Sequence, residues 1–120
     1  MKLDQVKAIL DAEVVVGSEY LDRQVFRGFG SDLMSDVLAF IDTDTLLLTG
    51  LNNAQVIRTA EMSDIHAIVF VRGKIPSKEV SELAEKKEIV LMSTKEILYT
   101  ACGKLYQNGL CGAQKHTLEE

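Results

Sequence analysis

Residues 45–72 read TLLLTGLNNAQVIRTAEMSDIHAIVFVR and predict a strand, a tight loop, a helix and a second strand. The apolar runs Leu46–Leu48 and Ala67–Val71 have the length and composition of buried strands. The segment between them places apolar residues at helical spacing, namely Val56, Ile57 and Ala60. Such a strand–helix–strand unit crosses over right-handed and gives parallel strands. The stretch therefore predicts an α/β fold.

Two more helices follow on the C-terminal side, with an apolar run from Ile89 to Met92 between them. Ser77 is the predicted cap of the first helix, and Ser93 or Thr94 that of the second. The predicted core positions on the three helices are Val56, Ile57, Ala60, Val80, Leu83, Ile97 and Ala101. The alternation predicts a mainly parallel sheet flanked by helices, with these adjacent strands: Leu46–Leu48, Ala67–Val71 and Ile89–Leu91.

The N-terminal side predicts a helix with one apolar face, followed by an apolar run from Glu13 to Val16. Val25 and Phe26 then predict a strand that ends at two glycines, Gly28 and Gly30. The next helix is predicted to start at Ser31, with Ser31 or Asp32 as its cap. No composition break divides the chain, so residues 1–112 are expected to form one domain and residues 113–120 a polar tail.

Composition excludes several classes of protein. A 47% share of hydrophobic residues is too high for a disordered chain. The 13 basic and 18 acidic residues give a formal net charge of −5, which argues against nonspecific nucleic-acid binding. No apolar run approaches the roughly 20 residues that span a bilayer, and the N-terminus lacks a signal-peptide core. We therefore expect a cytoplasmic protein in which Cys102 and Cys111, not spaced as a CxxC motif, stay reduced.

The best candidate site lies at the carboxyl ends of the predicted parallel strands, where open α/β sheets bind their ligands. Three loops meet there, and each precedes a helix N-terminus, whose free N–H groups suit an anion. The expected ligand is a small anion or a nucleotide, and the candidate binding residues are Gly50, Asn52, Asn53, Arg72, Gly73, Lys74, Ser93 and Thr94. The alternative is that these residues form ordinary caps and turns.

Asp32 and Asp36 form a second constellation, four positions apart and so on one face of the predicted helix. Such a pair could hold Mg²⁺ or act as acid and base, although an acidic first turn more often complements the helix dipole. The chain lacks the GxGxxG, GxxxxGK[ST], HExxH and GxSxG motifs. We therefore expect no catalytic residues, no metal and no cofactor.

The chain resembles the DRTGG domain, a small α/β module found beside CBS domains in regulatory proteins, and is similar to the N-terminal domain of bacterial HPr kinase/phosphorylase. The resemblance covers about Leu3 to Leu110. Its stretches are VVVG at Val14–Gly17, GSDLMSDVLAF at Gly30–Phe40, LLLTGLNNAQVIRTAEMSDIHAIVFVRGKIP at Leu46–Pro76, and a final helix around Thr94–Cys102. Gly50 and Gly73 keep the family's turn glycines, whereas the side chains at residues 51–53, 72 and 74 differ from the family motif.

The resemblance implies a regulatory or ligand-sensing domain that is non-catalytic and often dimeric. It does not imply kinase activity, because the kinase carries its P-loop in another domain. A homodimer is also expected because Phe26 and Phe29 lie in an apolar stretch that a small core need not absorb. Completion of the core by these two side chains is the competing interpretation. Two other functions stay open: a structural or assembly subunit, and a small metal-dependent enzyme that uses Asp32 and Asp36.

Overall fold

The computed structural model describes residues 1–41 and 43–113. The helices are α1 (Leu3–Leu10), α2 (Met34–Phe40), α3 (Ala54–Met62), α4 (Lys78–Lys86) and α5 (Leu98–Gln107). The strands are β1 (Glu13–Val16), β2 (Arg27–Gly30), β3 (Thr45–Thr49), β4 (Ala67–Phe70), β5 (Val90–Ser93) and β6 (Cys111–Gly112). A short 3₁₀ turn spans Ser18–Tyr20. The tail predicted for residues 113–120 lies, apart from Ala113, outside the described residues.

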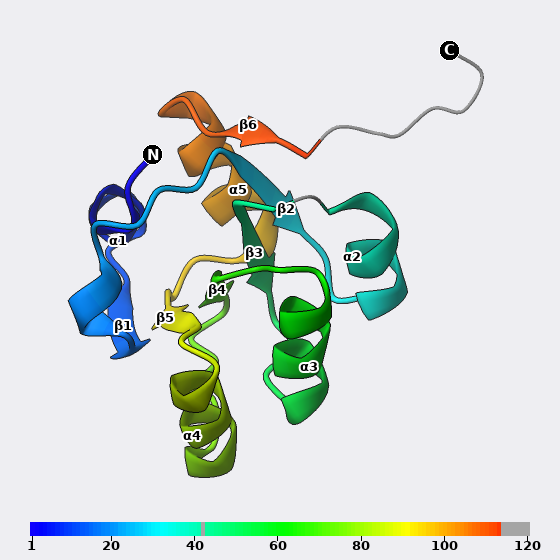
Figure 1. Ribbon diagram of the computed structural model, residues 1–120. Coiled ribbons are helices and arrows are strands. Elements are labelled where there is room, and N and C mark those ends of the chain that lie inside the picture. Colours follow the sequence, from blue (N-terminus) through cyan, green and yellow to red (C-terminus); the bar gives the residue numbers. More distant parts are fainter. Residues whose placement is uncertain (42, 114–120) are drawn as a thin grey trace.

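The strands form one sheet in the order β1-β5-β4-β3-β2-β6 (Figure 1). The pairs β2–β3, β3–β4, β4–β5 and β2–β6 are parallel, and β1 pairs antiparallel with β5. The prediction that three apolar runs form adjacent parallel strands is confirmed by β3, β4 and β5. Every residue of these three strands is buried, as expected for parallel strands covered on both faces.

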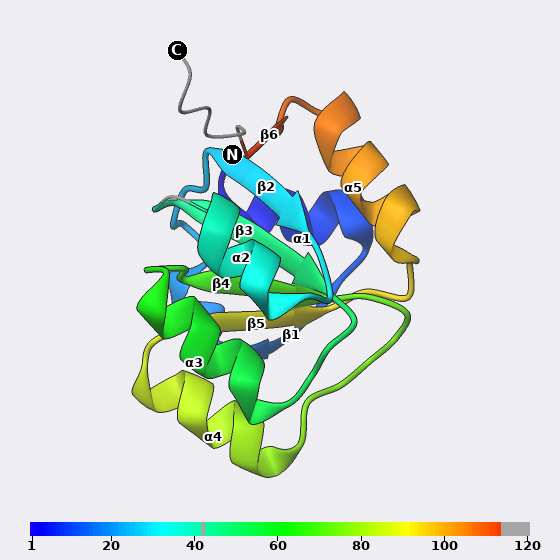
Figure 2. The same cartoon turned by 90° about the vertical axis from the view of Figure 1, so that its right-hand side faces the viewer.

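Helices cover both faces of the sheet, so the fold has three layers. Figure 2 shows α2, α3 and α4 together on one side and α1 and α5 on the other. Alternate strand residues point into the two cores: Leu46 and Leu48 pack with α1 and α5, while Leu47 packs with α2, α3 and α4. This arrangement confirms the predicted single α/β domain. No helix among the described residues is long and apolar enough to cross a membrane.

The predicted strand at Val25 and Phe26 is wrong in its position, because β2 begins at Arg27 and contains both glycines. Close packing explains the glycines. A Cβ at Gly30 would lie 2.7 Å from the Sγ of Cys102, and one at Gly28 would lie 3.2 Å from a methyl of Leu110. The glycines therefore let α5 and the segment after it approach the sheet, rather than ending the strand.

The start of α5 is also later than predicted. The helix begins at Leu98, and neither Ser93 nor Thr94 caps it. Ile97, predicted as core, is 60% exposed because it precedes the helix and faces solvent. The other predicted core positions are confirmed: Val56, Ile57, Ala60 and Val80 are buried in one core, Leu83 is half-buried against it, and Ala101 is buried in the core on the opposite face of the sheet.

The predicted cap of α2 is wrong as well. The helix starts at Met34, and its N-cap residue is Leu33, which has no side-chain cap bond. The Ser31 hydroxyl accepts a hydrogen bond from the Leu33 N–H at 3.0 Å, outside the helix. Asp32 turns instead toward the end of β3, where it becomes part of the candidate site.

Candidate functional site

The carboxyl ends of β3, β4 and β5 lie at one edge of the sheet, where Thr49, Phe70 and Ser93 are in register. The loops that follow are joined by backbone bonds. The Arg72 N–H donates to the carbonyl of Glu96 at 2.8 Å, and the Val71 N–H donates to that of Thr49 at 3.0 Å. The fold therefore brings the three predicted loops together.

The loop after β4 is a tight turn at Arg72 and Gly73. Both have positive φ, 60° and 68°, and the Lys74 N–H donates to the carbonyl of Val71 at 3.2 Å. These are features of a type I′ turn. The Gly73 N–H donates to the carbonyl of Thr94 at 2.8 Å. The backbone N–H groups of the turn are thus used within the protein, whereas the side chains of Arg72 and Lys74 are exposed.

Three of the predicted binding residues hold the loops in place. The Asn52 side-chain amide donates to the carbonyl of Ile75 at 3.0 Å, and the Ser93 hydroxyl donates to that of Lys74 at 2.7 Å. The Asn53 side chain caps α3 by accepting from the Gln55 N–H at 3.1 Å. For Asn53 the geometry is that of an ordinary helix cap.

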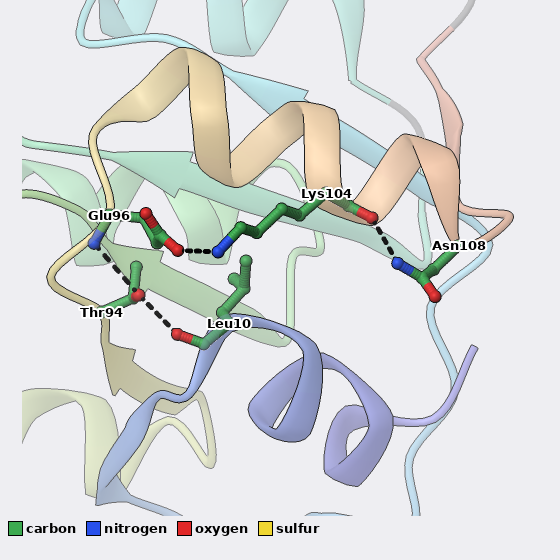
Figure 3. A network of polar contacts seen from close by, with 5 residues as sticks. All are labelled: Leu10, Thr94, Glu96, Lys104 and Asn108. Carbon is green, nitrogen blue, oxygen red and sulfur yellow. Dashed lines mark hydrogen bonds and ion pairs between the residues drawn. The ribbon is translucent and has the colours of Figure 1, made fainter.

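Thr94 is buried, with only 2% of its surface exposed, and its hydroxyl bonds within the protein. Its hydroxyl donates to the carbonyl of Leu10, at the end of α1, at 2.8 Å and accepts from the Glu96 N–H at 3.3 Å. Figure 3 shows two further contacts that link this loop to α5. The Lys104 side chain forms an ion pair with Glu96, and the Asn108 side chain donates to the Lys104 carbonyl. The Thr94 hydroxyl therefore joins α1 to the loop before α5.

Arg72 and Asp32 both lie close to Gly50. The Asp32 Oδ1 accepts from the Gly50 N–H at 2.7 Å and from the Thr49 hydroxyl at 3.0 Å. The Arg72 guanidinium packs against the glycine, since a Cβ at Gly50 would lie 2.3 Å from its Nη2. Among the described residues, no ion pair or side-chain hydrogen bond engages this guanidinium. The sequence pattern indicated a helix cap or a metal ligand at Asp32 and gave no sign of its bonds to Thr49 and Gly50.

A cleft of about 460 Å³ opens beside these loops, and three predicted residues line it: Gly73, Ser93 and Thr94. Its other polar lining comes from Asp11, Glu13, Lys95 and Glu96. Arg72 and Lys74 are not part of the lining. The predicted site is thus divided: the exposed side chains of Arg72 and Lys74 lie outside the cleft, and three of the four charged residues that line the cleft are acidic.

Asp32 and Asp36 were paired because both were expected on one face of a helix, and the structure contradicts this. Only Asp36 lies in α2, and the Asp32 carboxylate is bonded to Gly50 and Thr49. In the described part of the chain, no group of three or more His, Cys, Asp or Glu side chains could hold a metal. Both cysteines are free, and burial raises the pKa of the Cys102 thiol, which favours its protonated form.

Known proteins share both the sequence pattern and the fold of this chain. The profile of the DRTGG domain matches residues 5–107. A crystal structure of the CBS and DRTGG domains of the regulatory region of Clostridium perfringens pyrophosphatase, complexed with the activator diadenosine tetraphosphate, is similar at a TM-score of 0.73 and 24% identity. The match covers 98% of this chain and 52% of that one, so this chain spans about half the length of the related chain. No curated protein matches the sequence.

Proposed function

The chain belongs to the DRTGG domain family, and we propose that it is a non-catalytic regulatory domain that binds a small anionic ligand, such as a nucleotide, at the carboxyl edge of its sheet. The structurally similar pyrophosphatase carries its DRTGG domain in a regulatory region. That region binds diadenosine tetraphosphate, which supports a nucleotide as the ligand here.

The unpaired Arg72 guanidinium is the observation that carries this proposal. It lies where three loops meet, and it forms no ion pair with any carboxylate in the described residues. A guanidinium binds phosphate through two parallel charge-assisted hydrogen bonds, which are stronger than neutral ones. Lys74, two positions later and exposed, adds a second positive charge near the turn. Because the backbone N–H groups of this turn are already bonded, the side chains would provide most of the attraction.

Gly50→Ala and Arg72→Ala are expected to weaken nucleotide binding to a similar extent. The φ of Gly50 lies outside the left-handed region, so alanine can adopt its backbone conformation. Its methyl would occupy the position of the Arg72 guanidinium, a flexible group that can move away. Losing a hydrogen bond to a charged group costs about 1.5–3 kcal/mol, which corresponds to roughly a tenfold to hundredfold rise in Kd. Isothermal titration of the parent and both variants with diadenosine tetraphosphate and with ATP would measure the rise in Kd.

Gly103→Ala is the matched control for this experiment. Gly103 lies in α5, and nothing lies within 4 Å of its Cβ position. This variant should bind nucleotides like the parent and gain about 0.5–1 kcal/mol of stability from the better helix former. An Arg72→Ala protein that binds with unchanged affinity would refute the role of Arg72.

We also propose a homodimer whose interface includes Phe26. This side chain is 58% exposed, which is unusual for phenylalanine. Phe29 is half-buried and packs on Phe40 with 6.3 Å between ring centroids, so part of it completes the core and part stays available. Light scattering over a dilution series should give a dimer mass at tens of micromolar, and Phe26→Asp should give a monomer. A parent protein that is monomeric at that concentration would exclude the dimer.

A second candidate function, that of an assembly subunit without a ligand, is favoured by the outer surface of α5. Tyr99 and Tyr106 on this helix are 87% and 70% exposed, and aromatic side chains are common in protein interfaces. A ligand at a hundredfold excess over Kd stabilises the native state by about 2.7 kcal/mol. A thermal-shift screen in which no nucleotide or phosphorylated metabolite stabilises the protein would favour this function.

A cytoplasmic location stays a prediction, consistent with the two free thiols.

A further inference from the structure

The Asp32 carboxylate is held in one orientation at the proposed site. Both of its protein hydrogen bonds, from the Gly50 N–H and from the Thr49 hydroxyl, are made to Oδ1. The two donors come from the end of β3, whose residues are buried and fixed in the sheet. These two bonds restrict where the second oxygen, Oδ2, can lie.

The Oδ2 atom remains available to a ligand. No donor in the described residues bonds to it, and Asp32 is exposed. Asp32 and Arg72 both contact Gly50, yet no ion pair joins them. One small surface thus presents a free carboxylate oxygen, which can only accept hydrogen bonds, next to a free guanidinium, which can only donate them.

We propose that Asp32 determines the specificity of this surface, so that it selects phosphorylated ligands that also carry hydroxyl groups, as a ribose does, over bare inorganic polyanions. The inference rests on the proposed function, because it assigns the anionic group of the ligand to Arg72. A sugar hydroxyl of the same ligand donates to the Asp32 Oδ2.

Two physical effects of Asp32 act in the same direction. The carboxylate repels any polyanion that approaches Arg72, and this lowers the affinity for pyrophosphate. A ligand with a hydroxyl group recovers part of that loss through a charge-assisted hydrogen bond to Oδ2. A site built around such an acceptor discriminates against an analogue that lacks the hydroxyl, because the acceptor is then left without a partner.

The alternative role for Asp32 is purely structural, since its Oδ1 bonds order the loop after β3. The two roles predict different results for Asp32→Asn. Asparagine keeps an oxygen that can accept from Gly50 and Thr49, and it places an uncharged NH₂ group where the free oxygen was. If Asp32 only orders the loop, the substitution changes the affinity for all anionic ligands by the same factor.

The experiment measures Kd by isothermal titration for ADP, 2′,3′-dideoxy-ADP and pyrophosphate at one ionic strength. The parent is expected to bind ADP at least about tenfold more tightly than the other two, a difference of about 1.4 kcal/mol. In Asp32→Asn we expect this preference to fall at least about fivefold, with tighter binding of pyrophosphate. Thermal melting of the variant checks that the fold is intact. Asp36→Asn, which removes the same charge from α2, should keep the preference of the parent.

Each other outcome contradicts the inference in a recognisable way. A preference for ADP that is unchanged in Asp32→Asn, or lowered equally in Asp36→Asn, would show that Asp32 does not select the ligand, while nucleotide binding itself would stand. If neither the parent nor Asp32→Asn binds any of the three ligands, the proposed function fails and this inference fails with it. Equal affinity of the parent for ADP and its dideoxy analogue would exclude the ribose hydroxyls.

Discussion

Ala101→Asp is expected to leave the domain largely unfolded at room temperature. Ala101 lies in α5 with no exposed surface, packed in the core between that helix, α1 and the sheet. An aspartate there would have to bury a charge or take up a proton, at a cost of several kcal/mol. Domains of this size are stable by only about 5–15 kcal/mol, so most of the stability would be lost. Urea titration followed by circular dichroism would measure the change.

Tyr99→Asp is the matched control on the same helix. Tyr99 is two positions earlier and points into solvent. Exposed substitutions change stability by about 0.5 kcal/mol or less, and an aspartate in the first turn of α5 is favourable by about 0.3–1 kcal/mol, so no loss of stability is expected. The two variants introduce the same side chain, so the difference between them isolates burial. If Ala101→Asp unfolds at the same urea concentration as the parent, the inner face of α5 has been assigned wrongly.

Phe70→Ala should have the second-largest effect, a loss of about 3–5 kcal/mol. Phe70 is the last residue of β4 and has no exposed surface. It packs in the core formed with α2, α3 and α4. Truncation would remove its contacts and leave a cavity that a rigid parallel sheet cannot close. The expected result is a much lower urea midpoint with an unchanged slope, as in a two-state transition.

Phe26→Ala makes the same chemical change at an exposed position. It should leave the stability of the monomer within about 0.5 kcal/mol of the parent. Both variants should be measured at low concentration, because a dimer would add stability that depends on concentration. Equal losses in the two variants would contradict the assignment of Phe70 to the core.

The sequence predicted the central strands well because the physical signal is local. A strand covered on both faces must be apolar at every position, so β3, β4 and β5 appear as continuous apolar runs. The helices between them require a single apolar stripe, which was visible for α3 and α4. These features place the carboxyl edge of the sheet, where the candidate site was predicted.

The errors arose where one residue type serves two purposes. Serine, threonine and aspartate favour helix caps, but their oxygens bond equally well to distant backbone. Asp32 bonds to the Thr49 hydroxyl, 17 positions away, and the Thr94 hydroxyl bonds to the Leu10 carbonyl, 84 positions away. The glycines of β2 were also ambiguous in the sequence, because a glycine can mark the end of a strand or can permit close packing within it. Only the fold in three dimensions distinguishes these uses.

The pairing of β1 with β5 has a consequence for how the chain folds. Glu13 pairs with Ser93, so the first strand finds its partner only near the end of the sequence. The β3–α3–β4 and β4–α4–β5 units join nearby segments and can form early, whereas closing a long loop is slow. During synthesis, β1 would stay unpaired until β5 has left the ribosome. The pairing of β1 with β5 is therefore expected to form late in folding.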